Sequence, residues 1–243
     1  CALIDADAYP DRDWLSNAVK HFEDPNVAAV GGPNVTPEND GLHQLASGMI
    51  LSSKLGGAGL AHRYTLEKKR NDEDLPTCNL VLSKSVLDKL GGFNSDHWPG
   101  EDTYLCLQIT KHLRMRIVYS PEVVVYHHRR PLFKQHLKQI WSYGLHRGYF
   151  VKKFPETSRK PLYFTPSIFV MGLFLGLALS FLNSLLLMIY FSILAVYFGA
   201  CFVEGLKTKN PKMALLVFTG MFLTHVTYGV AFLKGLVTGN LKD

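Results

Sequence analysis

Three long apolar stretches dominate the C-terminal part of the chain. They cover about residues 162–182, 185–203 and 213–233, and none of them contains Lys, Arg, Asp or Glu. A helix of about 20 apolar residues is long enough to cross the hydrocarbon core of a bilayer. The titratable side chain of note within them is His225. The pattern therefore predicts three transmembrane helices, the first two of which are joined by a tight turn.

Basic residues flank these stretches and predict their orientation. The loop before the third stretch and the segment before the first are rich in cations: Lys207, Lys209 and Lys212, and Lys152, Lys153, Arg159 and Lys160. Short loops that carry Lys and Arg stay in the cytoplasm. We therefore expect a multi-pass protein of the cell (inner) membrane, with a cytoplasmic N-terminal part and a C-terminus on the outer side.

Residues 1–128 have the shorter periodicities of a mixed α/β domain. Apolar residues recur at helical spacing over 14–22, with Asp13 as the expected N-cap, and a second helix is expected to end at Gly91. Short β-prone runs occupy 26–32 and 79–83, and two more flank Pro121. Alternating strands and helices predict a sheet covered by helices.

Residues 129–161 combine aromatic and apolar side chains with many cations. From Phe133 onward the apolar positions follow helical spacing, which predicts an amphipathic helix. Such a helix suits the interfacial plane of an anionic membrane, whereas the alternative is a basic connector without lipid contact. The predicted organisation is thus 1–128 as an α/β domain, 129–161 as an interfacial segment and 162–243 as a three-span membrane domain.

Composition narrows the class of partner. The 243 residues are 47% hydrophobic and carry a formal net charge of +6. Because the cations cluster beside apolar stretches, we expect membrane lipids and not nucleic acid as the anionic partner. Four cysteines without a C-x-x-C spacing indicate neither disulfides nor a structural zinc site. The chain has no initiating Met and starts inside an apolar run, so we expect a fragment that lacks an N-terminal part.

The first candidate site is Asp5-Ala6-Asp7, which ends an apolar run. Alternate residues of a strand point to the same side, so both carboxylates could face one ion beyond the strand end. Oxygen ligands of this kind suit Mg²⁺ or Mn²⁺. The alternative is that both aspartates only stabilise a turn.

The second candidate site is Glu101-Asp102, which follows Gly100 and opens a helical pattern. Acids are common in the first turn of a helix because of its dipole, and this alone could explain them. Here the pair follows a Pro-Gly turn and Trp98, which could form one wall of a pocket. A carboxylate in such a place could accept the proton of a hydroxyl nucleophile.

The order of these motifs resembles that of inverting family 2 glycosyltransferases with the GT-A (Rossmann-like) fold. An apolar strand that ends in Asp-x-Asp is followed by a Cys-Asn element and "LGGF", then by "GED" and finally by "VYHH". The resemblance covers residues 1 to about 150 and implies the C-terminal part of a catalytic domain. It also implies a preceding nucleotide-binding half, so the fragment alone is expected to be inactive.

The resemblance implies a role for each matching residue. Asp5 and Asp7 match the metal and diphosphate motif, and His127 matches a histidine that reaches the metal or diphosphate in some GT-A enzymes. Asp102 matches the catalytic base, with Glu101 as its neighbour. The donor-sugar and acceptor site is implied for three residues of one element: Thr77, Cys78 and Asn79.

The implied reaction transfers a sugar from a nucleoside diphosphate sugar to a lipid-linked or glycan acceptor. The attached spans resemble those of bacterial enzymes that build exopolysaccharide or other envelope glycans. The Gln-x-x-Arg-Trp element of processive synthases is missing, and residues 139–148 read "QIWSYGLHRG", which favours single additions. Arg147 in this segment could belong to a lid over the diphosphate or anchor lipid headgroups.

Two other functions fit the same sequence. A polyprenyl-phosphate glycosyltransferase would use an acceptor that is already anionic and needs no strong base. A non-enzymatic three-span protein with a cytoplasmic binding module would use the aspartates only as caps. The sequence has no Walker A motif and no G-x-S-x-G elbow, and nothing in it predicts an oligomeric state.

Overall fold

The computed structural model describes residues 1–57, 59–93 and 100–241. It divides into two compact units, of which the first comprises 1–40 and 60–129 and the second 41–59 and 130–243. The sequence pattern predicts a domain boundary near residue 128, with 41–59 in the α/β domain. The segment 41–59 instead packs with the C-terminal helices, because its helix buries apolar residues against them.

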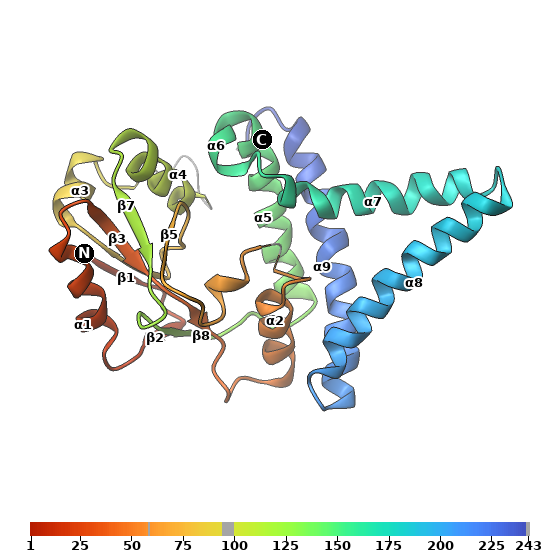
Figure 1. The fold of residues 1–243 in the computed structure, drawn as a ribbon, viewed down its shortest axis with the longest axis horizontal. Helices are drawn as coiled ribbons and strands as arrows, with labels where there is room; N and C mark the ends of the chain where they lie inside the picture. The colour runs from red at the N-terminus through yellow and green to blue at the C-terminus, as the bar shows by residue number, and fades with distance from the viewer. Residues whose placement is uncertain (58, 94–99, 242–243) are drawn as a thin grey trace. The chain divides into compact units, whose positions relative to one another are not determined.

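The first unit is built on a mixed five-stranded sheet (Figure 1). Its strands, in spatial order, are β1 (Ala2–Ile4), β6 (Asn79–Leu82), β3 (Val27–Gly31), β7 (Arg116–Tyr119) and β5 (Arg70–Asp72). The β3–β7 pair is parallel, whereas β6 runs antiparallel to both β1 and β3. A smaller sheet joins β2 (Ala8–Pro10), β8 (Val125–His127) and β4 (Asn34–Val35).

Alternation along the strands produces a core on each face of the large sheet. In β6, Leu80 and Leu82 enter one cluster, and Val81 between them enters the other. The first cluster is covered by α3 (Lys84–Lys89) and α4 (Glu101–Leu107), and the second by α1 (Trp14–Val19). The predicted sheet with covering helices is confirmed. Its shorter helical turns are η1 (Lys20–Glu23), η2 (Ala61–Arg63) and η4 (Gln108–His112).

The ends of the short helices test two local predictions. Helix α3 ends as expected, because Gly91 has a positive φ of 73° and its N–H bonds the Asp88 carbonyl oxygen. Asp13 lies at the N-cap position of α1, but its side chain makes no capping hydrogen bond there. The Asp13 backbone carbonyl instead accepts the Asn17 N–H at 2.8 Å. The predicted N-cap position of Asp13 is confirmed, but a capping role of its side chain is not.

The second unit is helical. It contains α2 (Leu42–Ser52), α5 (Lys134–Lys153), α6 (Pro155–Ser158), α7 (Pro161–Ser180), α8 (Ser184–Leu206) and α9 (Pro211–Val237). Helices α7, α8 and α9 are each long and apolar enough to cross a membrane, which confirms the three predicted helices. Asn183 and Asn210 cap α8 and α9 with their side-chain oxygens. Helix α9 is longer than predicted and includes Lys212 and Lys234.

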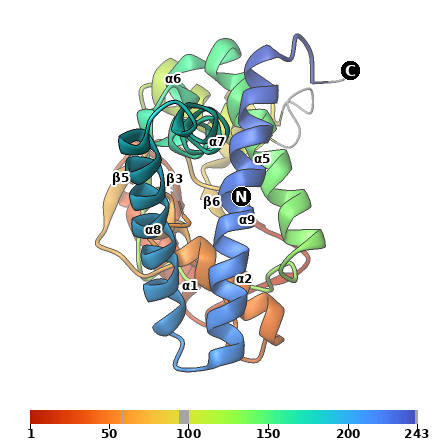
Figure 2. The ribbon, with the colours of Figure 1, turned by 90° about the vertical axis from the view of Figure 1, so that its right-hand side faces the viewer.

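Helix α5 lies alongside α9, as both ribbon views show (Figures 1 and 2). The two helices run in parallel directions, since Gly144 lies against the backbone of Tyr228 and, one turn further along both helices, Gly148 lies against the backbone of Phe232. These glycines let the two backbones approach closely. The predicted amphipathic helix is thus present, and its apolar face packs on another helix of the same chain. An interfacial position in a membrane stays a prediction.

The close α5–α9 contact predicts a stability difference between two glycine-to-alanine variants. A Cβ added at Gly148 would clash with the Phe232 carbonyl oxygen, whereas one at Gly199 in α8 meets nothing within 4 Å. We expect Gly148→Ala to lower the free energy of unfolding by about 1–3 kcal/mol, because the helices must move apart. Gly199→Ala should leave it unchanged or raise it by up to ~1 kcal/mol.

Thermal unfolding of the detergent-solubilised protein measures the difference. Equal melting temperatures for the two variants would contradict the close packing of α5 on α9.

Candidate active site

The two aspartates of the first motif lie in a turn. Strand β1 ends at Ile4, and the Ala8 N–H donates to the Asp5 carbonyl oxygen at 3.1 Å, which turns the chain into β2. Asp5 and Asp7 lie outside β1, so the prediction that alternation along a strand aligns their carboxylates is wrong. The turn, and not the strand, sets their directions, and both side chains are exposed.

His127 brings these carboxylates together. Strand β8 pairs with β2 so that His127 lies opposite Ala8. Its Nε2 is 3.1 Å from an Asp7 carboxylate oxygen and 3.9 Å from one of Asp5. The next residue adds a main-chain bond, because the His128 N–H donates to the Asp7 carbonyl oxygen at 3.1 Å. Three residues that the resemblance assigned to one site thus converge.

The ligand chemistry of this cluster fits a divalent cation. Asp5, Cys78 and His127 each have one ligand atom within 4.8 Å of the other two. Burial, and then the charge of Arg129, lower the pKa of His127, so its imidazole is neutral at neutral pH and can act as a ligand. The Nδ1 of His127 is buried without a hydrogen-bond partner among the residues that the structure describes.

Cys78 and Asn79 differ in what they can contribute. Burial, with a smaller contribution from the charge of Asp5, raises the pKa of Cys78 to about 12, so its thiol is protonated. Asn79 is buried, and its amide already bonds Trp14 and the carbonyl oxygens of Pro33 and Val123. These bonds make Asn79 an anchor between the sheet and α1, and the substrate-lining role implied for it stays a prediction. Thr77 is partly buried in the turn before β6.

Glu101 and Asp102 form the first turn of α4, as predicted. The Gly100 N–H donates to Glu101 at 2.8 Å, and the Thr103 N–H donates to Asp102 at 2.7 Å. Burial, followed by the negative charge of Asp74, raises the pKa of Asp102 to about 6. A carboxylate with this pKa is mostly ionised at neutral pH and is a stronger base than an exposed one.

For two predicted site residues, a place beside the carboxylates stays untested. Trp98 lies outside the described residues. Arg147 belongs to the second unit, where its guanidinium lies over the Tyr163 ring at 5.1 Å from the centroid. Its predicted roles, as part of a lid or as a headgroup anchor, stay predictions.

Several charged residues near the site were not predicted. Asp40 is buried, and one of its oxygens lies 2.5 Å from Nδ1 of His128. Arg129 donates its backbone N–H to Asp40 at 3.2 Å and stacks over the Tyr64 ring. These bonds hold the chain just after His127. The run "HHRR" at 127–130 was the available signal, because buried cations need partners.

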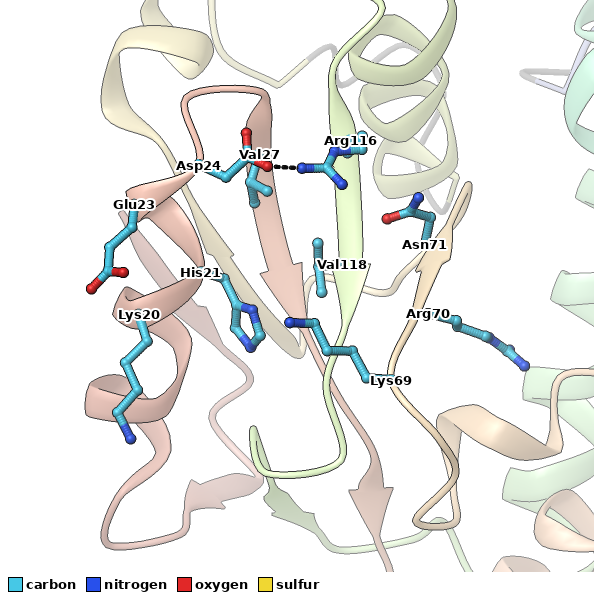
Figure 3. Close-up of a pocket in the computed structure, with 10 residues that line it drawn as sticks. All are labelled: Lys20, His21, Glu23, Asp24, Val27, Lys69, Arg70, Asn71, Arg116 and Val118. Atoms are coloured by element: carbon cyan, nitrogen blue, oxygen red, sulfur yellow. Dashed lines mark hydrogen bonds and ion pairs between the residues drawn. The ribbon is translucent and has the colours of Figure 1, made fainter.

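A separate cavity of about 570 Å³ lies over β3, β5 and β7 (Figure 3). The side chains of Lys69 and His21 point into it, and Arg116 at its edge forms an ion pair with Asp24. None of the predicted site residues that the structure describes lines this cavity. The carboxylate and histidine cluster is therefore a different site, at the ends of β1 and β8.

Fold and site together define a class of protein. A mixed α/β domain with carboxylates at a strand end, followed by long apolar helices, is the arrangement of a GT-A catalytic domain with a membrane region. The sequence model of the glycosyl transferase family group 2 matches residues 2–224. The chain belongs to this family, whose members are transferases that generally use a divalent cation.

Two curated relatives show how far the similarity extends. A Methanococcus voltae protein, dolichyl N-acetyl-alpha-D-glucosaminyl phosphate 3-beta-D-2,3-diacetamido-2,3-dideoxy-beta-D-glucuronosyltransferase, is 24% identical over 98% of this chain and 71% of its own length. A pre-mycofactocin glycosyltransferase of Mycobacterium tuberculosis is 28% identical over 59% of this chain and 30% of its own length. Both relatives are glycosyltransferases, in agreement with the family.

The raised pKa of Asp102 predicts that removing this charge stabilises the protein. Because the folded-state pKa of about 6 exceeds the unfolded value near 4, the folded state prefers the protonated carboxyl group. Its contribution to the free energy of unfolding is present below about pH 4 and is lost as pH rises through about 6. We expect Asp102→Asn to add roughly 1–3 kcal/mol at pH 7.5 and little at pH 4.

Thermal unfolding at the two pH values measures this effect, with Glu38→Gln at an exposed carboxylate as the control. A destabilised Asp102→Asn variant at pH 7.5 would contradict the buried-charge interpretation.

Proposed function

We propose that the protein is an inverting glycosyltransferase that moves a sugar from a nucleoside diphosphate sugar to a lipid-linked or glycan acceptor. The observation that carries this proposal is the convergence of Asp5, Asp7 and His127, residues 120 positions apart in sequence, at one strand end. The same first unit holds a further carboxylate, that of the partly buried Asp102, whose pKa is raised. Family membership supports both assignments.

In the proposed reaction the acceptor hydroxyl oxygen attacks the anomeric carbon of the donor sugar. The bond from this carbon to the diphosphate oxygen breaks, and the diphosphate leaves with the bonding electron pair. Asp102 accepts the hydroxyl proton as the new glycosidic bond forms. One displacement on the face opposite the leaving group inverts the anomeric centre.

Asp5, Asp7 and His127 would hold the divalent cation, which when bound neutralises charge on the leaving diphosphate. Carboxylate oxygens suit Mg²⁺ and Mn²⁺ equally, whereas the imidazole nitrogen is a softer ligand and favours Mn²⁺. The protonated thiol of Cys78 stays a neutral neighbour of the cluster. We therefore propose Mn²⁺ as the preferred ion.

The acceptor is proposed to be carried by a membrane lipid. Helices α7 and α8 expose large apolar side chains along most of their length, including Phe174 of α7 and Met188 of α8. A membrane-held enzyme meets a lipid-linked acceptor at a high effective concentration. The Methanococcus voltae relative is named for a dolichyl-linked sugar phosphate, which supports such an acceptor here. A place at the cytoplasmic face, in exopolysaccharide or envelope glycan synthesis, belongs to the same proposal.

The cation site predicts metal-dependent nucleotide binding. We expect the complete protein to bind UDP or GDP more tightly with Mn²⁺ than without it, and Asp5→Asn with Asp7→Asn to abolish the difference, because the carboxylates bind the ion. Calorimetric titration with each nucleotide, with Mn²⁺ and with Mg²⁺, measures this. The exposed Asp88→Asn is the control. Binding that is indifferent to both metal and double variant would argue for the non-enzymatic alternative.

Asp102 predicts a separation of binding from turnover. Asp102→Asn keeps the shape of the side chain but cannot accept a proton. We expect turnover to fall by about 10²–10⁴-fold, whereas the dissociation constant of the donor changes little. Transfer assays with the complete protein in membranes and donor titrations measure the two quantities. Wild-type turnover in this variant would favour a lipid phosphate acceptor, which needs no base.

A further inference from the structure

A buried ion pair lies beneath the first turn of α4. The guanidinium of Arg63, in η2, is 3.2 Å from an Asp74 carboxylate oxygen and also donates to the Asp74 backbone carbonyl. Both residues are buried. Two polar contacts on one partner fix the relative positions of η2 and the segment that follows β5.

Thr103 connects this pair to the proposed base. Its hydroxyl donates to the same Asp74 oxygen at 3.1 Å, and its backbone N–H donates to Asp102 at 2.7 Å. Thr103 is itself buried. Thr103 is thus bonded to two carboxylates, to Asp74 through its side chain and to Asp102 through its backbone.

We propose that Asp74, held by Arg63, is a positioning residue for Asp102, and that it orients the first turn of α4 through Thr103 and supplies a fixed negative charge near the base. The proposal rests on the proposed function, because it assumes that Asp102 is the base. It adds two residues of the segment 63–74, Arg63 and Asp74, which belong to none of the sequence motifs that point to the site.

The charges around Asp102 agree with this arrangement. Burial has the largest effect on the pKa of Asp102 and raises it, the negative charge of Asp74 raises it further, and the positive charge of Arg63 lowers it. Glu101 adds a smaller increase. The thiols of Cys78 and Cys106 also sense the Asp102 charge, and burial raises the pKa of both, so they stay neutral.

Removing the charge of Asp74 should lower the pKa of Asp102, whereas removing the charge of Arg63 should raise it. Asp74→Asn keeps the shape and leaves an amide oxygen for the Thr103 hydroxyl, but removes the negative charge. Arg63→Gln removes the positive charge that offsets it. A purely structural pair would not produce shifts of opposite sign, because loss of either partner would only loosen the fold.

The test is the pH dependence of kcat/KM of the complete protein in membranes. Activity should fall below the pKa of Asp102, where the base is protonated. We expect this acid limb to move to lower pH in Asp74→Asn and to higher pH in Arg63→Gln, each by about one unit. Arg63→Lys, which keeps the charge, should restore most of the wild-type profile.

Thr103→Val tests positioning separately from charge. It removes the hydroxyl link to Asp74 but keeps the backbone bond to Asp102 and both charges. We expect kcat to fall by about tenfold or more, because the base is displaced. The acid limb should stay at the same pH, because the charges that set the pKa of Asp102 are unchanged. Thr103→Ser should recover the loss.

A neighbouring ion pair provides the matched control. Lys111 and Glu73 meet at 2.8 Å on the exposed side of the same segment. Glu73→Gln should leave both kcat and the acid limb unchanged. Thermal unfolding identifies any variant that fails to fold, and Asp74→Asn, the closest in shape, carries the test alone if Arg63→Gln does not fold.

The outcomes distinguish this inference from the proposed function. Full turnover in Asp102→Asn would show that Asp102 is not the base, and both the proposed role of Asp102 and this inference would fail. An inactive Asp102→Asn together with unmoved acid limbs in Asp74→Asn and Arg63→Gln would overturn the positioning role and leave the proposed function standing. Shifts in the same direction for both variants would also overturn it.

Discussion

The site of the first unit depends on one contact, that of the His127 imidazole with the carboxylates of Asp5 and Asp7. It requires the pairing of β2 with β8, which joins residues near the two ends of that unit. Two exposed carboxylates that close repel each other, and the contact therefore has to be supported from behind. The buried bonds of Asp40 to His128 and Arg129 provide that support, because they fix the chain immediately after His127.

The environment of the Asp102 carboxylate in α4 differs from that of Asp5 and Asp7. Asp5 and Asp7 face solvent and a partner, whereas Asp102 is partly buried, and the negative charge of Asp74 raises its pKa. Burial of a charge costs stability, and a protein can retain such a cost where reactivity requires it. The two kinds of carboxylate therefore suit two tasks, since an exposed ionised pair can hold a cation, and a partly buried carboxylate with a raised pKa can accept a proton. This division is what a displacement at a diphosphate-linked sugar needs.

The second unit shows how one chain uses apolar helices in two ways. Helix α9 buries a stripe of residues against α5 and α2, and Gly144 and Gly148 allow the close approach. In this contact region, His136 of α5 is buried between the hydroxyls of Ser47 in α2 and Thr224 in α9, and burial lowers its pKa to about 4. It is therefore neutral and acts as a polar link among three helices. Helix α8, in contrast, is almost wholly exposed, as expected of a surface that meets lipid.

Local patterns in the sequence predicted most of the helices and strands and the residue types of the site, because periodicity and end signals act over a few residues, whereas α2 was not predicted. Asp5, Asp7 and Asp102 could be found in this way, as could the three apolar helices. Tertiary structure decided what depends on distant pairing and burial. It gave Asn79 its bonds to Trp14 and two carbonyl oxygens, placed 41–59 with the C-terminal helices, and joined Asp74 to Thr103 across 29 positions. No local pattern encodes such contacts, since the free energy of burying a polar group depends on partners that only the folded chain brings near.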